Sequence, residues 1–112
     1  MAVTAKVIIA AQTVANSQTT VYTAGAGVRT IIDKFTATNY SGSAAVLSIN
    51  LVTTGDTAGN QNLIIKEKSL SAGETYSFPE IVGHVMDPGG FISTLAGTAS
   101  AINIRACGRE VT

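Results

Sequence analysis

Short runs of alternating apolar and polar residues make up most of the chain, with turn-forming residues at intervals of roughly eight to twelve positions. The runs are rich in Val, Ile, Thr, Phe and Tyr, and Gly, Asn, Ser, Asp or Pro stand between them. Side chains of a strand point alternately to its two faces, so this rhythm is typical of a half-buried antiparallel sheet. No window shows the apolar period near 3.6 that indicates a helix.

The pattern predicts about eight short strands. They span residues 5–14, 18–23, 28–40, 44–53, 62–68, 75–78, 91–95 and 101–107. Residues 80–86 fit either a short strand or one helical turn, and the pattern does not decide between them. The last strand, residues 101–107, alternates cleanly, with Ile102, Ile104 and Ala106 on its inner face.

The two central strands are predicted to form one long antiparallel hairpin. Residues 39–43 supply a turn, in which Gly42 is available for a positive φ. In strand 28–40 the face that carries Phe35 is predicted to point inward, because Lys34 on the other face needs water. That inward face consists of Ile31, Asp33, Phe35 and Ala37. In strand 44–53 the inward face consists of Ala45, Leu47, Ile49 and Leu51.

A length of 112 residues fits one domain, so residues 1–112 are predicted to form a single antiparallel β-sandwich. Lys6 precedes an apolar run, Val7–Ala11, which Gln12 ends. That run is shorter than the ~7–15 residues of a signal-peptide core, so it is interpreted as a strand. Because a terminal strand has one free end, residues 1–15 are a candidate exchanged or added strand.

Charged residues make up only 12% of the chain, about half the usual share, and seven Lys and Arg balance seven Asp and Glu. A neutral chain lacks the positive patch that binds nucleic acid and the basic face of a membrane-surface helix. No apolar run approaches the ~20 residues that span a bilayer. Two interpretations remain open: Thr and Ser on the wet faces of strands, or a surface that a partner protein covers at low desolvation cost.

Catalytic chemistry has few candidates. His84 is the only histidine and Cys107 the only cysteine. One of each cannot supply the three or four ligands of a metal site, and no spacing indicates a Cys–His pair. His84 is therefore interpreted as structural or surface-exposed, and Cys107 as a small filler that is buried or lines an interface. A single cysteine forms no intrachain disulfide, which suits assembly in a reducing cytosol.

Two glycine-containing loops superficially suggest ligand binding. The loop around Asp56 lacks the alternating acids and terminal Glu of a calcium loop, so it is interpreted as a turn. The Gly25–Gly27 loop lacks the third Gly and the Lys-Ser/Thr pair of a phosphate loop. The sequence therefore predicts no enzyme activity, no catalytic residues, no metal site and no cofactor.

Three segments carry a family resemblance. They are Ile32–Asn39 continuing into Leu47–Val52, Ser71–Tyr76 continuing into Glu80–Met86, and Leu95–Gly108. Together they resemble small β-sandwich structural proteins of tailed bacteriophages, namely capsid decoration (cement) proteins and neck or tail accessory proteins. The shared features are strands and turns rather than a chemical motif, so no functional residue is carried over.

The resemblance implies a jelly-roll-like sandwich that acts as a structural virion protein, most specifically a decoration subunit that binds and stabilises the assembled shell. It also implies a homo-oligomer (dimer or trimer), with the major capsid protein or other virion subunits as partners. The implied location is the virion, assembled in the host cytoplasm. Alternatives are a neck or tail accessory protein, a carbohydrate- or receptor-binding module, and a small hydrolase. The tyrosines Tyr22, Tyr40 and Tyr76 would have to supply any carbohydrate platform, since the chain has no Trp.

Overall fold

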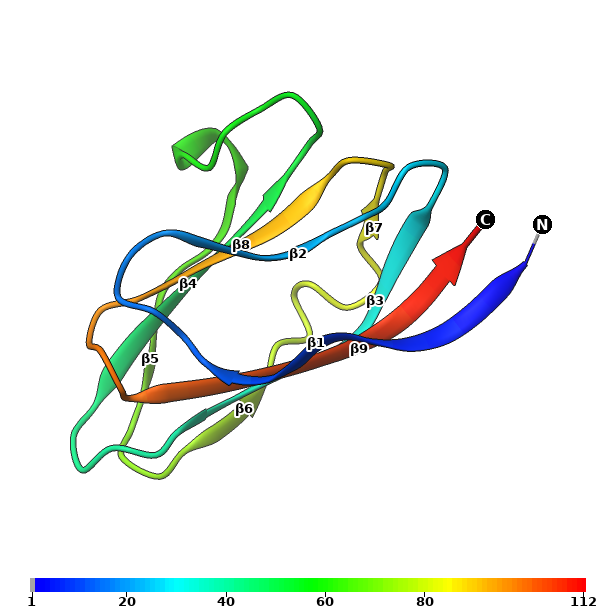
Figure 1. The fold of residues 1–112 in the computed structure, drawn as a ribbon. Coiled ribbons are helices and arrows are strands. Elements are labelled where there is room, and N and C mark those ends of the chain that lie inside the picture. The colour runs from blue at the N-terminus through cyan, green and yellow to red at the C-terminus, as the bar shows by residue number, and fades with distance from the viewer. Residues whose placement is uncertain (1) are drawn as a thin grey trace.

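Residues 2–112 of the computed structural model form two antiparallel β-sheets packed face to face (Figure 1). The strands are β1 (Val3–Thr13), β2 (Thr19–Thr23), β3 (Arg29–Asn39), β4 (Ala45–Val52), β5 (Leu63–Leu70), β6 (Thr75–Ser77), β7 (Val85–Met86), β8 (Phe91–Ala96) and β9 (Ile102–Val111). One short 3-10 helix, η1 (Asn60–Asn62), precedes β5. The predicted all-β sandwich is confirmed, and the predicted strands match eight of these nine.

The strand order is that of a jelly roll. One sheet has the order β1-β9-β3-β6, with β7 beside β3, and the other has the order β2-β8-β4-β5. The chain changes sheet between β1 and β2, between β2 and β3, and between β3 and β4, which distinguishes this fold from a meander of adjacent hairpins. We call the two layers the β1-β9-β3-β6 sheet and the β2-β8-β4-β5 sheet.

The predicted hairpin of residues 28–40 and 44–53 is wrong, because β3 and β4 lie in different sheets. β3 pairs with β9, β6 and β7, whereas β4 pairs with β5 and β8. The side chain of Asn39 explains the crossover. Its amide nitrogen donates to the carbonyls of Ser43 (2.8 Å) and Leu70 (2.9 Å), and its amide oxygen accepts from the N–H of Ser41. This buried amide joins the end of β3 to the opposite sheet.

The predicted facing of β3 is wrong before Phe35, because the strand contains a bulge. The pairing with β9 shifts between Ile32 and Lys34, so Asp33 is an extra residue. Since one extra residue reverses the alternation, Ile32 is fully buried beside Phe35, whereas Ile31 is half-exposed on the outer face. The predicted inward direction of Phe35 is confirmed.

Residues 80–86, which the pattern left undecided between strand and helical turn, consist of hydrogen-bonded turns followed by a two-residue strand. Residues 79–83 form turns, and only Val85–Met86 is a strand. The N–H of Gly83 donates to the carbonyl of Ile32, and the N–H of Ile32 donates to the carbonyl of His84. These bonds attach the segment to the margin of the β1-β9-β3-β6 sheet.

The core fills the space between the sheets. Phe35 and Phe78 meet edge to face, with ring centroids 5.7 Å apart, and Tyr76 packs on Phe78 at 4.8 Å. The inward residues predicted for β4 are buried with the exception of Leu51, which is half-buried. The other fully buried large side chains are Ile9, Ile32, Leu47, Ile49, Leu70, Ile81, Ile92, Ile102, Ile104 and Val14.

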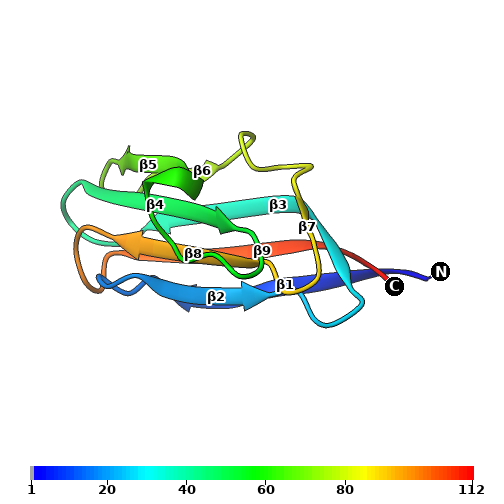
Figure 2. The ribbon, with the colours of Figure 1, turned by 90° about the horizontal axis from the view of Figure 1, so that it is seen from above.

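The molecule is elongated, with extents of 46 × 26 × 20 Å. Figures 1 and 2 agree that the N-terminal end of β1 and the C-terminal end of β9 extend side by side past the loops at that end of the sandwich. The N–H of Ala2 donates to the carbonyl of Thr112, and the N–H of Thr112 donates to that of Ala2. The projecting end is therefore a paired ribbon.

Candidate interaction surfaces

The outer face of the β1-β9-β3-β6 sheet carries most of the exposed aliphatic side chains at its projecting end. Strand register places them in neighbouring rows: Val3 opposite Val111, Val7 opposite Cys107, and Ile31 between Arg109 and Val85. Exposure is 56% for Val3, 44% for Val7 and 53% for Val85. We call this surface the terminal face, defined as Val3, Ala5, Val7, Ile31, Val85, Cys107 and Val111.

One pair of opposite charges lies within the terminal face, between Arg109 and Asp33. Arg109 on β9 donates from Nε and Nη2 to the carboxylate of Asp33 on the neighbouring strand β3, at 2.9–3.1 Å. The hydrogen bond and the charge of Asp33 raise the pKa of the Arg109 guanidinium. An exposed pair adds little to stability, but it neutralises both of these charges.

The remainder of the same outer face is polar, and it carries the exposed cations Lys34, opposite Cys107, and Arg105, opposite Thr36. Thr13 Oγ1 donates to Asn103 Oδ1 at 2.7 Å, and the hydroxyls of Thr38 and Thr75 are 3.0 Å apart. Hydroxyl and amide groups satisfy one another across the strands in these rows. Covering these paired hydroxyl and amide groups costs less than covering ionised groups.

β1 is an edge strand over its whole length, because it pairs with β9 on one side only. Ala2 and Thr112 exchange both of their backbone hydrogen bonds, and bonded pairs alternate along an antiparallel ladder. Thr4 and Lys6 therefore direct their backbone groups toward β9. Val3, Ala5 and Val7 direct theirs to the open side of the sheet.

On the inner side of β1, a small polar network joins the two sheets. Lys6 Nζ lies 3.2 Å from Glu110 Oε2, and the Tyr22 hydroxyl donates to the same oxygen at 2.8 Å. The Tyr22 hydroxyl also lies 2.6 Å from Thr30 Oγ1. The hydrogen bonds from Tyr22 and Lys6 lower the pKa of Glu110, whereas burial is the largest cause that raises the pKa of Tyr22. The network holds the projecting ribbon against β2.

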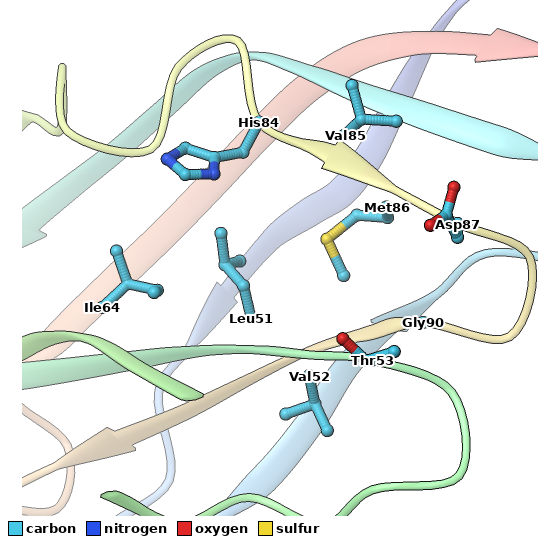
Figure 3. Close-up of a pocket in the computed structure, with 9 residues that line it drawn as sticks. All are labelled: Leu51, Val52, Thr53, Ile64, His84, Val85, Met86, Asp87 and Gly90. Atoms are coloured by element: carbon cyan, nitrogen blue, oxygen red, sulfur yellow. The ribbon is translucent and has the colours of Figure 1, made fainter. Parts of the chain in front are cut away.

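A hollow of about 210 Å³ opens between β4, β5 and β7. Figure 3 shows Leu51, Ile64, His84 and Met86 around it. His84 and Asp87 both line it, but no hydrogen bond joins them. Its walls combine aliphatic side chains with the polar groups of Thr53, His84 and Asp87. Within residues 2–112 no three His, Cys, Asp or Glu side chains are placed to hold a metal ion.

The two residues considered for catalysis lie apart. Cys107 is half-exposed on the outer face of β9, opposite Val7 and Lys34, and His84 lines the hollow beside β7. They share no pocket. Asp56 accepts hydrogen bonds from the N–H of Thr57 at 2.8 Å and from the Gln61 amide, and these lower its pKa. The interpretation of this loop as turn chemistry agrees with those contacts.

The three tyrosines do not share a surface. Tyr22 points between the sheets toward Thr30 and Glu110. Tyr76 packs on Phe78 beneath Lys68, whose Nζ lies 4.5 Å above the ring. Tyr40 is 51% exposed in the loop after β3. A carbohydrate platform would need such rings on one face.

The sequence alone does not predict that the residues of the terminal face lie together. Val3, Ala5 and Val7 show the alternation that places them on one face of a strand. The positions of Ile31 and Val85 depend on the bulge at Asp33 and on the pairing of β7, for which the sequence carries no signal.

No family model and no curated protein matches this chain. Among solved structures, it is similar to a chain from Bacillus endospore appendages, described as a novel family of disulfide-linked pili. That similarity has a TM-score of 0.56 and 12% identity, and it covers 98% of this chain and 88% of the other.

The chain is also similar to chains of infectious bursal disease virus. For the Gx strain the TM-score is 0.58 at 13% identity, and for the Gt strain it is 0.54 at 8% identity. In both cases 97% of this chain is covered, but it spans only 32% of the viral chain. At these identities the comparisons show a shared fold. Over residues 2–112, no helix is long and apolar enough to cross a membrane.

Proposed function

We propose that this chain is a structural subunit of a protein assembly, and specifically a decoration subunit that binds and stabilises a virus shell. One observation carries the proposal: exposed Val3, Val7 and Val85 gather on one face of a molecule with no net charge. Exposed aliphatic groups that share one face are typical of surfaces that other proteins cover.

The fold comparisons support the assembly role. A spore pilus and a virus have in common that many protein subunits pack together, and both contain chains with this jelly-roll arrangement. The proposed partners are therefore other shell or virion subunits and further copies of this chain. The proposed location is the virion, assembled in the host cytoplasm. Within residues 2–112 the two catalytic candidates, His84 and Cys107, lie apart, and we propose no enzyme activity.

The disulfide linkage described for the pilus does not, by itself, join copies of this chain into a continuous polymer. A subunit with one cysteine forms one disulfide, which joins two chains and then stops. A continuous covalent fibre needs at least two cysteines in each subunit. We therefore propose that the contacts of this chain with its neighbours are non-covalent.

The test is the composition of purified particles. Particles released by cells that encode this chain are isolated on a density gradient, and quantitative mass spectrometry then measures its copy number relative to the major shell protein. A decoration role predicts a fixed ratio set by the shell lattice. A neck or tail accessory role predicts only a few copies per particle. Absence of the chain from purified particles would overturn the proposal.

A matched pair of variants connects the result to the terminal face. Val85→Lys places a charge in that face, whereas Thr98→Lys places the same charge in the exposed loop between β8 and β9. Both positions are exposed, so both variants are expected to fold. We expect Val85→Lys to lower the copy number at least about tenfold, because covering an unpaired charge is costly. Thr98→Lys is expected to leave it unchanged.

A further inference from the structure

We propose that two copies of this chain pair through the open edges of their β1 strands, antiparallel and in one register, with a two-fold axis at Ala5. This inference deepens the assembly role proposed above by naming one partner and the strand that binds it. The occupant is a second copy of β1, and the argument rests on backbone direction, side-chain register and access.

The backbone groups of three alternate residues face the open side. Val3, Ala5 and Val7 direct N–H and C=O away from β9, because Ala2 and Thr112 exchange both bonds and the bonded pairs alternate from there. Unpaired edge groups of this kind are templates for an added strand. Three successive outward residues suffice for about six inter-chain hydrogen bonds, two for each bonded pair.

Side chains select the register. With the axis at Ala5, Val3 of one copy lies opposite Val7 of the other, and the two Ala5 residues lie opposite each other. All of these side chains lie on the outer face, where Val3 and Val7 are exposed. Cross-strand pairs of β-branched residues stabilise sheets, so this register buries the exposed valines of both copies against each other.

The neighbouring registers are poorer. An axis at Lys6 places the two lysines directly opposite each other and uses only Ala5 and Val7 for bonding. An axis at Thr4 uses only Val3 and Ala5. With the axis at Ala5, each Lys6 lies opposite Thr4 of the other copy and keeps its own Glu110 at 3.2 Å. Only this register uses all three outward residues without opposing like charges.

Access and charge permit the pairing. The β1–β9 ribbon extends past the adjacent loops in both views (Figures 1 and 2), so a second sheet can approach the edge. The chain has no net charge, so two copies do not repel each other. The result is a sheet that runs continuously through both molecules and joins their terminal faces.

The first test is a proline at the axis. In Ala5→Pro the lost N–H faces the open side, so the variant keeps its bonds to β9 but loses two inter-chain bonds. We expect the dimer dissociation constant, measured by sedimentation equilibrium, to rise at least about tenfold. Ala5→Ser keeps the N–H and is expected to dimerise as the natural chain does.

A second variant covers the case in which proline disturbs the fold. Ala5→Glu places a carboxylate beside Arg109 of its own chain, which favours folding. In the dimer the two introduced carboxylates lie opposite each other, so we expect a loss of dimer comparable with that of Ala5→Pro.

Disulfide cross-linking of cysteine variants tests the proposed register. In a Cys107→Ser background, Ala5→Cys chains are expected to form a covalent dimer with oxidised glutathione, because opposed bonded residues lie about 5.5 Å apart at Cα. Thr4→Cys and Lys6→Cys chains are expected to cross-link when mixed with each other and poorly when each is alone. Thr75→Cys, on the opposite margin of the same sheet, serves as the control.

The outcomes separate this inference from the assembly role. A monomeric natural chain at millimolar concentration would overturn the β1 pairing. An oligomer that Ala5→Pro leaves intact, or cross-linking at Thr4 or Lys6 alone, would also overturn it. None of these results removes the chain from purified particles, which is the measurement that decides the assembly role.

Discussion

At the scale of single residues, Glu110 connects the projecting ribbon to the rest of the sandwich. Its carboxylate accepts from Lys6 on β1 and from Tyr22 on β2, so one side chain links strands of both sheets. The side chain is only 18% exposed, which limits the screening of these bonds by solvent. The hydrogen bonds favour the charged form and lower its pKa from the ordinary value of 4.5.

This depressed pKa predicts a pH-dependent contribution to stability. A carboxyl whose pKa is lower in the folded state stabilises the fold above its unfolded pKa, and it loses that effect as pH falls through the folded pKa. We expect Glu110→Gln to cost about 1–2 kcal/mol at pH 7. The difference from the natural chain should shrink as pH falls from about 5 to about 3 in urea titrations. A difference that does not vary with pH would contradict the ion-pair network.

Gly108 is a second residue whose identity the structure requires. A Cβ there would collide with the backbone carbonyl of Ile31 on the neighbouring strand, beside the bulge. We expect Gly108→Ala to lower the free energy of unfolding by about 1–3 kcal/mol. Gly42→Ala is the control, since nothing lies within 4 Å of its added Cβ, and we expect a change within about 0.5 kcal/mol. Equal stabilities of the two variants would contradict the close approach of β9 and β3.

At the scale of elements, the least local feature of the fold is the crossover from β3 to β4. The hairpin predicted from Gly42 and two alternating strands was wrong. A turn signal shows that the chain reverses, but it does not show whether the next strand pairs beside the last one or crosses to the other sheet. Buried Asn39 decides this through its bonds to Ser43 and Leu70. Leu70 is far along the chain, so no local pattern indicates that contact.

The crossover has its own prediction. Asn39→Ala removes a donor to the buried carbonyl of Leu70 and one of the two donors to the carbonyl of Ser43, so we expect a loss of about 2–3 kcal/mol. The urea midpoint should fall with an unchanged slope. Asn103→Ala, on the exposed face of β9, removes one surface bond to Thr13 and should cost well under 1 kcal/mol. Equal losses in the two variants would mean that Asn39 does not hold the sheets together.

Most strands and their inward faces could be predicted from the sequence, because burial on one face of a strand leaves a period of two. The bulge at Asp33 could not, since one extra residue changes the facing without changing the composition. Val85 shows the same limit for the candidate surface. It joins the terminal face only through the pairing of the two-residue β7 with β3, and so short a strand leaves no periodic signal.

At the scale of the whole molecule, zero net charge and a jelly-roll fold agree with a subunit that other proteins cover. Single exposed valines are ordinary on protein surfaces. Here three of them share the outer face of one sheet, and two of these lie on its open edge strand. These features together, rather than the fold alone, support an assembly role.

Weak electrostatics predict how self-association responds to salt. The proposed β1 pairing depends on backbone hydrogen bonds and aliphatic contact, and each Lys6 is neutralised within its own chain. We therefore expect the dimer dissociation constant to change less than about threefold between about 0.05 and 0.5 M NaCl. Weakening by more than about tenfold would indicate an interface held by charge, and the proposed register would then be wrong.

The central claim is that this chain works by packing against other protein subunits in a shell, and imaging of the intact particle tests it most directly. Electron cryo-microscopy of purified particles should show the jelly roll at positions that repeat with the shell lattice, with Val3, Val7 and Val85 covered by neighbouring protein. Particles whose reconstructed shell lacks this sandwich, or carries it with that face open to solvent, would contradict the account.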